Sequence, residues 1–266
     1  MALLDKIFRK KKIGLALSGG AAYGFAHIGV LKALKKNKIK IDYVAGVSAG
    51  AIVGAIFAAG MDPDIMEVNA KKVGWFRFLK FPLGKTGILS TEEIEKFIIE
   101  NIGDKEIKDL NIPFAAVAVD LMSGKEVVID KGKVARAAAI SSAFPGIFSA
   151  VEIDNKLLVD GTVYNNLPTS VVKKMGADIV IAVDVIPANH LKKAPANQVQ
   201  ILERAYDILV KSSTEQSRKM ANIVIEPEIP DDIWHFDVDE YPQLIKAGEE
   251  AARKKIAEIK TKVTFF

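Results

Sequence analysis

A unit made of an apolar strand, a glycine turn and a helix occurs twice within the first 60 residues, and it constrains the fold more than any other feature. In the first unit, Ile13–Leu17 leads into the turn 18–20, and apolar residues at helical spacing continue to residue 35. In the second, the short strand 43–45 leads into Gly46 and a small, apolar helix over 49–59. Such units build parallel sheets that helices cover, so the opening predicts an α/β fold.

The same alternation continues through the rest of the chain. The run 179–185 is expected to be a strand of the apolar kind that parallel sheets bury on both faces. Further strands are predicted over 114–119, 126–129, 156–159 and 223–225, and helices over 167–175, 198–220 and 241–262. Pro168 is expected in the first turn of its helix. The pattern predicts a layered α/β protein with a mainly parallel central sheet.

No Pro/Gly-rich linker or shift in composition divides the sequence, and 266 residues fit one large α/β domain. We expect 13–266 to form that single domain, after a basic and apolar N-terminal tail at 1–12. The tail suits either a solubilising extension or a surface anchor. It lacks the apolar centre of a secretory signal, and no stretch reaches the roughly 18 apolar residues of a membrane span. We expect the protein to be cytoplasmic, and a peripheral location at the inner membrane surface is the alternative.

Two residue counts limit the chemistry. There is no cysteine, which excludes disulfides, thiolate metal sites and a cysteine nucleophile. There are only three histidines, His27, His190 and His235, so a mechanism based on histidine has few candidates. The net charge of +4 does not by itself indicate nucleic acid. We expect no metal and no cofactor.

The run from Gly46 to Gly50 matches the pattern G-x-S-x-G, which holds a nucleophilic serine on a strained turn between a strand and a helix. The small residues are needed because such a turn brings backbone segments close together. Here the pattern lies between a predicted strand and a predicted helix, as the chemistry requires. The competing interpretation is a glycine-rich turn in which Ser48 only caps the helix. The context favours Ser48 as a nucleophile.

The glycine turn after the first strand suits the second requirement of a serine hydrolase, an oxyanion hole. Backbone N–H groups at a helix start can stabilise the negative oxygen of the intermediate, each by on the order of 3 kcal/mol. The candidate donors are Gly19, Gly20, Ala21 and Ala49, and Gly24 gives the loop room. A nucleotide-binding loop would need G-x-G-x-x-G or a Lys-Ser/Thr pair, and neither is present.

Asp160 and Gly161 follow an apolar strand and provide a candidate base. Taken alone, an aspartate beside a glycine at a strand end is more often a turn residue. The histidines offer weaker alternatives: His190 and His235 lie in polar stretches beside prolines, and His27 falls one turn into a helix. A buried aspartate would need a raised pKa to act on a serine, because its ordinary value is about 3.9.

The segment 71–85 interleaves aromatic and basic residues. It suits a packed flap, a contact with an anionic lipid surface or a nucleic-acid contact, in that order, because no nucleic-acid fold surrounds it. The candidate lipid contacts are Trp75, Phe76, Phe78 and Phe81.

Taken together, these motifs resemble the patatin-like phospholipase family, especially its small bacterial members, from about residue 13 to residue 184. The glycine loop 17–20 with Gly24 and 27–31, the elbow 46–50 and the segment 160–162 occur in the family's order. The stretches 120–124, 139–145 and 165–168 fit as well. The resemblance implies a three-layer α/β/α fold, a Ser-Asp dyad without histidine, and hydrolysis of lipid esters of the phospholipase A or lysophospholipase kind through an acyl-enzyme.

The sequence departs from the family pattern in the oxyanion loop. Ala21 and Tyr23 stand where the family usually has a third glycine and an arginine or lysine. Thr162 replaces a smaller residue. The loss of the positive charge leaves a second function open: a membrane-surface binding or regulatory module whose esterase site is weak or vestigial. The intact Ser48 and Asp160 favour the hydrolase.

Overall fold

The computed structural model describes residues 11–71, 89–187 and 194–264. Within these ranges one mixed sheet of eight strands has the order β5-β6-β3-β2-β1-β7-β8, and β4 pairs with β3. The strands β1, β2, β3, β7 and β8 run parallel to one another, whereas β4, β5 and β6 add antiparallel pairs around β3. The strand bounds are β1 Ile13–Leu17, β2 Tyr43–Val47, β3 Phe114–Asp120, β4 Lys125–Ile129, β5 Val151–Ile153, β6 Lys156–Asp160, β7 Ile179–Val183 and β8 Ile223–Ile225.

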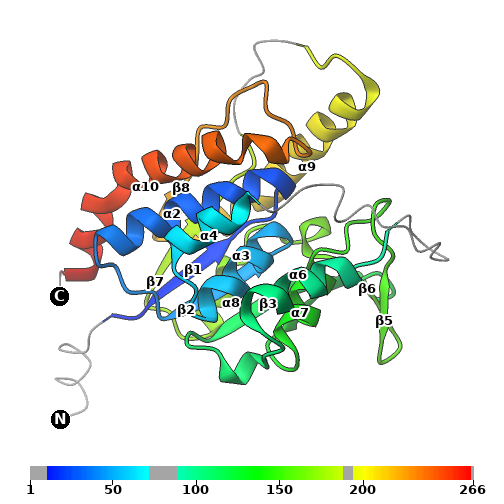
Figure 1. Cartoon of the computed structure of the whole chain (residues 1–266), viewed down its shortest axis with the longest axis horizontal. Coiled ribbons are helices and arrows are strands. Elements are labelled where there is room, and N and C mark those ends of the chain that lie inside the picture. Colours follow the sequence, from blue (N-terminus) through cyan, green and yellow to red (C-terminus); the bar gives the residue numbers. More distant parts are fainter. Residues whose placement is uncertain (1–10, 72–88, 188–193, 265–266) are drawn as a thin grey trace.

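Helices cover both faces of the sheet, which confirms the predicted three-layer α/β/α architecture (Figure 1). Alternating residues of β1 show the two faces: Leu15 and Leu17 belong to the large core on the side of α2 and α10, whereas Ala16 packs with α8. The helices are α2 Phe25–Lys36, α3 Ala49–Ala58, α4 Pro63–Ala70, α6 Glu92–Ile102, α7 Val134–Ser141, α8 Thr169–Lys174, α9 Gln198–Met220 and α10 Tyr241–Thr264. None in the described ranges is long and apolar enough to cross a bilayer.

Most element boundaries differ from the prediction by one or two residues, and three differences bear on the loops around the sheet ends. The helix expected from residue 21 is divided, because Ala21 has a positive φ of 47° and starts a 3-10 turn, Ala21–Gly24, before α2. The strand expected over 179–185 ends at Val183, and the N–H of Val185 donates to the hydroxyl of Ser18 (3.0 Å). Pro168 lies at the N-cap of α8 rather than in its first turn.

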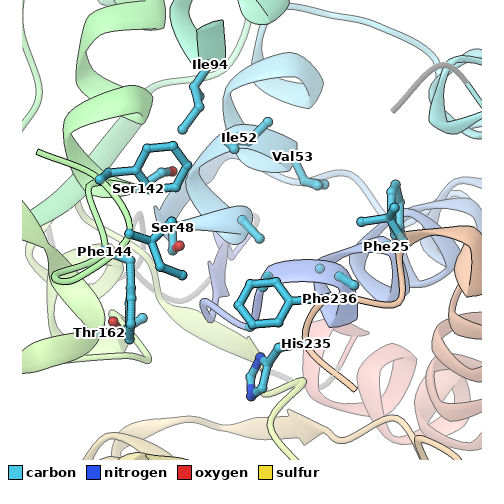
Figure 2. A pocket seen from close by; sticks show the side chains of 18 of the residues that line it. Phe25, Ser48, Ile52, Val53, Ile94, Ser142, Phe144, Thr162, His235 and Phe236 are labelled. Carbon is cyan, nitrogen blue, oxygen red and sulfur yellow. The ribbon is translucent and has the colours of Figure 1, made fainter. Parts of the chain in front are cut away.

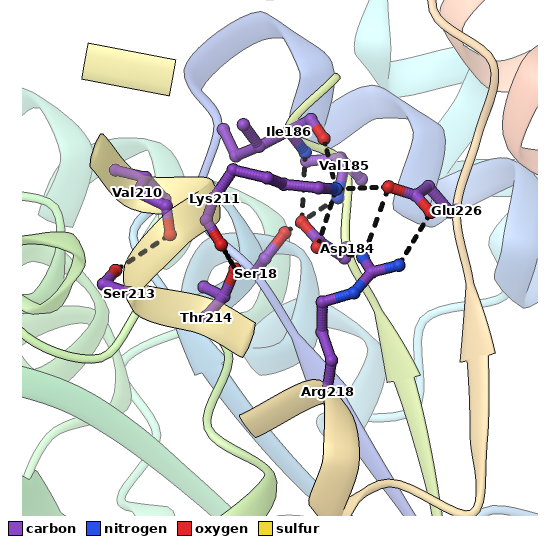
Figure 3. A network of polar contacts seen from close by, with 10 residues as sticks. All are labelled: Ser18, Asp184, Val185, Ile186, Val210, Lys211, Ser213, Thr214, Arg218 and Glu226. Carbon is purple, nitrogen blue, oxygen red and sulfur yellow. Dashed lines mark hydrogen bonds and ion pairs between the residues drawn. The ribbon is translucent and has the colours of Figure 1, made fainter. Parts of the chain in front are cut away.

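A cluster of charged side chains fixes α9 against the ends of β7 and β8 (Figure 3). Asp184 is fully buried, and its carboxylate accepts hydrogen bonds from Lys211 Nζ at 3.0 Å and Arg218 Nη1 at 2.5 Å. Both cations also bind Glu226, just beyond β8. A buried carboxylate is tolerated when it is paired and hydrogen-bonded in this way. The cluster thereby positions the helix that forms one wall of the cavity described below.

Candidate active site

The edge of β3 brings Ser48 and Asp160 together. Because β4 pairs with β3 along its outer edge from Ala116 to Asp120, β2 and β6 must share the other edge. β2 runs parallel to β3 and pairs as far as Val117, and β6 runs antiparallel and pairs from Ala118 onward. The carboxyl ends of β2 and β6 therefore meet head to head. Ser48 directly follows β2, and Asp160 is the last residue of β6.

Gly161 allows this close approach. A Cβ atom at Gly161 would lie 2.4 Å from the carbonyl oxygen of Val117 and 3.1 Å from Val47 Cγ1. Gly24, Gly46 and Gly50 are crowded in the same way, with ideal Cβ positions 2.3 to 2.5 Å from neighbouring atoms. The glycines of the predicted elbow and its support thus lie where side chains would collide.

Ser48 has the backbone expected of a nucleophile elbow. Its φ of 50° and ψ of −124° lie outside the regions that a serine ordinarily adopts, and it occupies the N-cap of α3. Its N–H donates to the carbonyl oxygen (3.2 Å) and the hydroxyl (3.0 Å) of Ser141, whose hydroxyl in turn donates to Val117 O (2.6 Å). These bonds hold a strained turn, and the Ser48 side chain lines the cavity (Figure 2).

The carboxylate of Asp160 is fully buried behind Ser48. Oδ1 accepts a hydrogen bond from the N–H of Thr162 at 2.9 Å, whereas Oδ2 accepts no well-formed hydrogen bond from the described residues. Burial raises the pKa of Asp160 to about 6, although the Thr162 N–H and the Ser48 hydroxyl act in the opposite direction. A carboxylate with such a pKa can accept a proton near neutral pH.

The loop after β1 presents two of the predicted oxyanion donors to the cavity. Gly20 and the exposed Ala21 line it, as does Ala49, the first residue of α3. The first N–H groups of a helix have no intrahelical acceptor and carry the positive end of its dipole. Gly19 is a correction to the prediction, because its N–H donates to Asn166 Oδ1 at 2.9 Å. The candidate donors are therefore Gly20, Ala21 and Ala49.

A cavity of about 400 Å³ opens in front of Ser48. Its volume lies within the roughly 300–1,000 Å³ of pockets that hold small organic ligands. The walls are mostly apolar, with Ile52 and Ile56 from α3, Ile94 and Phe97 from α6, and Val199 and Leu202 from α9 among the lining residues. Such a space suits an apolar chain attached to the group that reacts with Ser48.

Sequence reasoning misses one group of polar lining residues, which comes from α9 and the segment before α10. Glu203, Tyr206 and His235 line the cavity there. His235 Nε2 lies 2.7 Å from Asp207 Oδ1, so this buried imidazole has a carboxylate partner of its own. One feature of the sequence could have indicated this group: Glu203 and Asp207 are one turn apart on α9, so two carboxylates share one face of a predicted helix.

Tyr23 lies beneath the cavity rather than in its lining. Its hydroxyl donates to the carbonyl of Ile233 at 3.0 Å, and its ring centroid lies 4.5 Å from that of His235. The departure from the family pattern thus supports the His235 wall. His27 is fully buried and bonded to the carbonyl of Ser18, and burial lowers its pKa to about 4.

The predicted lipid contacts Trp75, Phe76, Phe78 and Phe81 lie outside the described residues, as does His190.

The family model for patatin-like phospholipases matches residues 15–173, and the chain belongs to this family. It is 35% identical over 191 residues to an uncharacterised NTE family protein of Mycobacterium tuberculosis, a match that covers 71% of the chain and 52% of that relative. It is also 35% identical over 181 residues to the neuropathy target esterase sws of Drosophila melanogaster, covering 65% of the chain and 13% of the relative. The chain therefore spans about half the length, or less, of these relatives.

Among solved structures, VipD from Legionella pneumophila superimposes with a TM-score of 0.63 at 12% sequence identity. The match covers 94% of this chain and 67% of VipD. At 12% identity the similarity to VipD shows a shared fold, which agrees with the three-layer arrangement described above.

Proposed function

We propose that this protein hydrolyses carboxylic esters of lipids, with Ser48 as the nucleophile and Asp160 as the base. The observation that carries the proposal is the strained Ser48, which lines an apolar cavity, with the buried Asp160 at the strand end that meets its own. Membership of the family and relatives named esterase and lysophospholipase support the same chemistry. Phospholipase A or lysophospholipase activity is the expected form.

The geometry suits two half-reactions. In the first, Asp160 takes the hydroxyl proton as Ser48 Oγ attacks the ester carbonyl, and N–H groups of Gly20, Ala21 and Ala49 stabilise the oxyanion. The intermediate collapses, the ester C–O bond breaks, and Asp160 returns the proton to the leaving alcohol. In the second, Asp160 activates a water that attacks the acyl-enzyme, and the fatty acid and free Ser48 result. These steps require no metal or cofactor.

The pH dependence of fatty-acid release tests this role of Asp160. A base must be ionised, so kcat/KM for a lysophospholipid or a monoacylglycerol is expected to fall as the pH drops through about 6, the raised pKa of Asp160. The same midpoint is expected in a His235→Gln variant, whatever its absolute rate. A midpoint that disappears in His235→Gln would assign the titration to the imidazole and contradict the proposal.

We also propose that α9 contacts the lipid surface that holds the substrate. Five apolar side chains on its first three turns are 47% to 71% exposed: Val199, Ile201, Leu202, Ile208 and Leu209. Over 198–210 both carboxylates are buried, which leaves Arg204 as the only charged side chain at the surface of this stretch. Val199 and Leu202 also line the cavity, so the exposed face is continuous with the entrance that an acyl chain would use.

The double substitution Ile208→Ser/Leu209→Ser tests this contact, since neither residue lines the cavity. We expect vesicle binding and turnover of vesicle lipid to fall about tenfold or more, because two apolar side chains no longer enter the interface. Turnover of a short, soluble ester is expected to stay unchanged. Ile65→Ser/Val68→Ser on α4 is a matched control, with side chains 54% and 58% exposed. Equal losses in both variants would contradict a specific role of α9.

A further inference from the structure

Glu203 is an unpaired carboxylate inside an apolar cavity. Its side chain projects from α9, is only 7% exposed and lines the space in front of Ser48. Neither Oε1 nor Oε2 has a hydrogen-bond partner among the described residues. Buried carboxyl oxygens normally have partners, since an unmade bond costs about 1–3 kcal/mol. The mechanism proposed above makes no use of Glu203.

The surroundings of Glu203 do not supply the missing partner. His235 is close enough to favour the charged form of Glu203, but its Nε2 faces Asp207 Oδ1 at 2.7 Å. Burial, together with the charges of Asp207 and Asp237, raises the pKa of Glu203. A buried carboxylate without a protein partner, on a residue that lines the cavity, indicates a place for a ligand that donates hydrogen bonds.

The position within the cavity indicates which half of the ester meets Glu203. In Figure 2 Ile52 and Ile94 lie on one side of Ser48, and His235 lies on the other with Phe236 beside it. Glu203 belongs to the His235 side, together with Tyr206. An acyl chain can pack against the apolar lining, which includes Val199, Leu202 and Phe236 near Glu203, but it offers no hydrogen-bond donor to a buried carboxylate. The hydrogen-bond donors of the substrate lie on the alcohol half of the ester, so that half is the one that can satisfy Glu203.

We propose that Glu203 binds a hydrogen-bond donor on the alcohol half of the substrate and thereby selects esters whose alcohol carries such a donor. The donor is a glycerol hydroxyl or an ammonium headgroup, both of which satisfy a carboxylate that has no protein partner. This inference rests on the proposed hydrolase function and adds the class of alcohol to it. It assigns Glu203 to specificity rather than to proton transfer.

Three substrates with the same fatty acid test the inference: a 1-monoacylglycerol with hydroxyl donors, a diacylphosphatidylethanolamine with an ammonium donor, and a p-nitrophenyl ester with neither. The readout is kcat/KM for each lipid divided by kcat/KM for the p-nitrophenyl ester. In Glu203→Leu we expect at least one ratio to fall about 10- to 100-fold, mainly through KM, since a hydrogen bond to a charged group is lost. Glu203→Gln, which keeps hydrogen-bonding atoms at the position, is expected to give a smaller fall.

The pattern of losses identifies the donor. A fall confined to the monoacylglycerol ratio indicates the hydroxyl, and a fall confined to the phosphatidylethanolamine ratio indicates the ammonium group. Glu215→Leu, at an exposed position on the same helix, is the control and is expected to leave both ratios unchanged. If neither ratio falls in a folded Glu203→Leu or Glu203→Gln variant, the inference is overturned. Absence of p-nitrophenyl ester turnover in the wild type would instead contradict the proposed function itself.

Discussion

Asp160→Asn is expected to lower kcat for ester hydrolysis about a thousandfold or more, because the amide cannot accept the proton of Ser48. The fold is expected to survive, since the substituted side chain keeps an oxygen for the hydrogen bond from the Thr162 N–H. Asp120→Asn is a matched control: Asp120 is also buried, but it holds the turn after β3 through Met122 and Ser123. Comparable losses of kcat in both folded variants would contradict a specific role of Asp160.

Although Asp160→Asn lowers activity, it is expected to raise the free energy of unfolding relative to the wild type above about pH 6. Because the pKa of Asp160 is raised from 3.8 to about 6 by burial, ionisation of this group costs the folded state about 3 kcal/mol. The raised pKa means that the wild type keeps its full stability below about pH 4 and loses this amount as the pH rises through 6. Relative to Asp160→Asn, the wild-type free energy of unfolding is expected to fall between pH 4 and pH 8. Denaturant titrations at the two values measure the difference.

Gly29→Ala is expected to be the most damaging of the small substitutions, with a loss of several kcal/mol in the free energy of unfolding. The helices α2 and α10 lie side by side (Figure 1), and their backbones come close at Gly29 and at Gly248. A Cβ atom there would lie 1.8 Å from the carbonyl oxygen of Ile245. Backbone atoms cannot rotate away as side chains can, so α10 would have to shift.

Gly54→Ala on α3 provides the control for Gly29→Ala. Both glycines are helical, so alanine improves helix propensity by about 1 kcal/mol at either position. A Cβ atom at Gly54 would meet only side-chain atoms, at 3.0 Å or more. The contrast between the two variants isolates the contact with α10. Equal melting temperatures would show that the two helices are not packed as closely as the structure indicates.

Much of the fold follows from local patterns in the sequence. The apolar strands β1 and β2 and the glycine turns after them lie where spacing predicts, because parallel strands buried on both faces have little freedom in composition. Among the described helices that the prediction misses is α4, although Asp62 caps it and Pro63 occupies its first turn. The capping signal was present, but the helix lacks a strong apolar repeat. The short α7 and β5 give even less pattern to detect.

Residues of the site that belong to local motifs can be predicted from the sequence, whereas contacts between distant segments cannot. Ser48 lies on a local turn whose glycines mark it in the sequence, and Asp160 is found from its motif. Their meeting depends on the shared edge of β3, which is a property of strand register rather than of either motif. Glu203 and Asp207 are one turn apart on α9, but His235 comes from a distant segment and no spacing rule joins it to them. The use of the Gly19 N–H by Asn166 is likewise visible only in three dimensions.

The proposed mechanism depends on Ser48 as the nucleophile and on Asp160 as the base that activates it. Labelling by a fluorophosphonate ester tests this most directly, with intact mass measured for the wild type, Ser48→Ala and Asp160→Asn. We expect one covalent adduct on the wild type, none on Ser48→Ala, and labelling of Asp160→Asn that is slower by orders of magnitude. An adduct that persists on a folded Ser48→Ala, or a folded wild type that never reacts while a soluble ester is turned over, would contradict this mechanism.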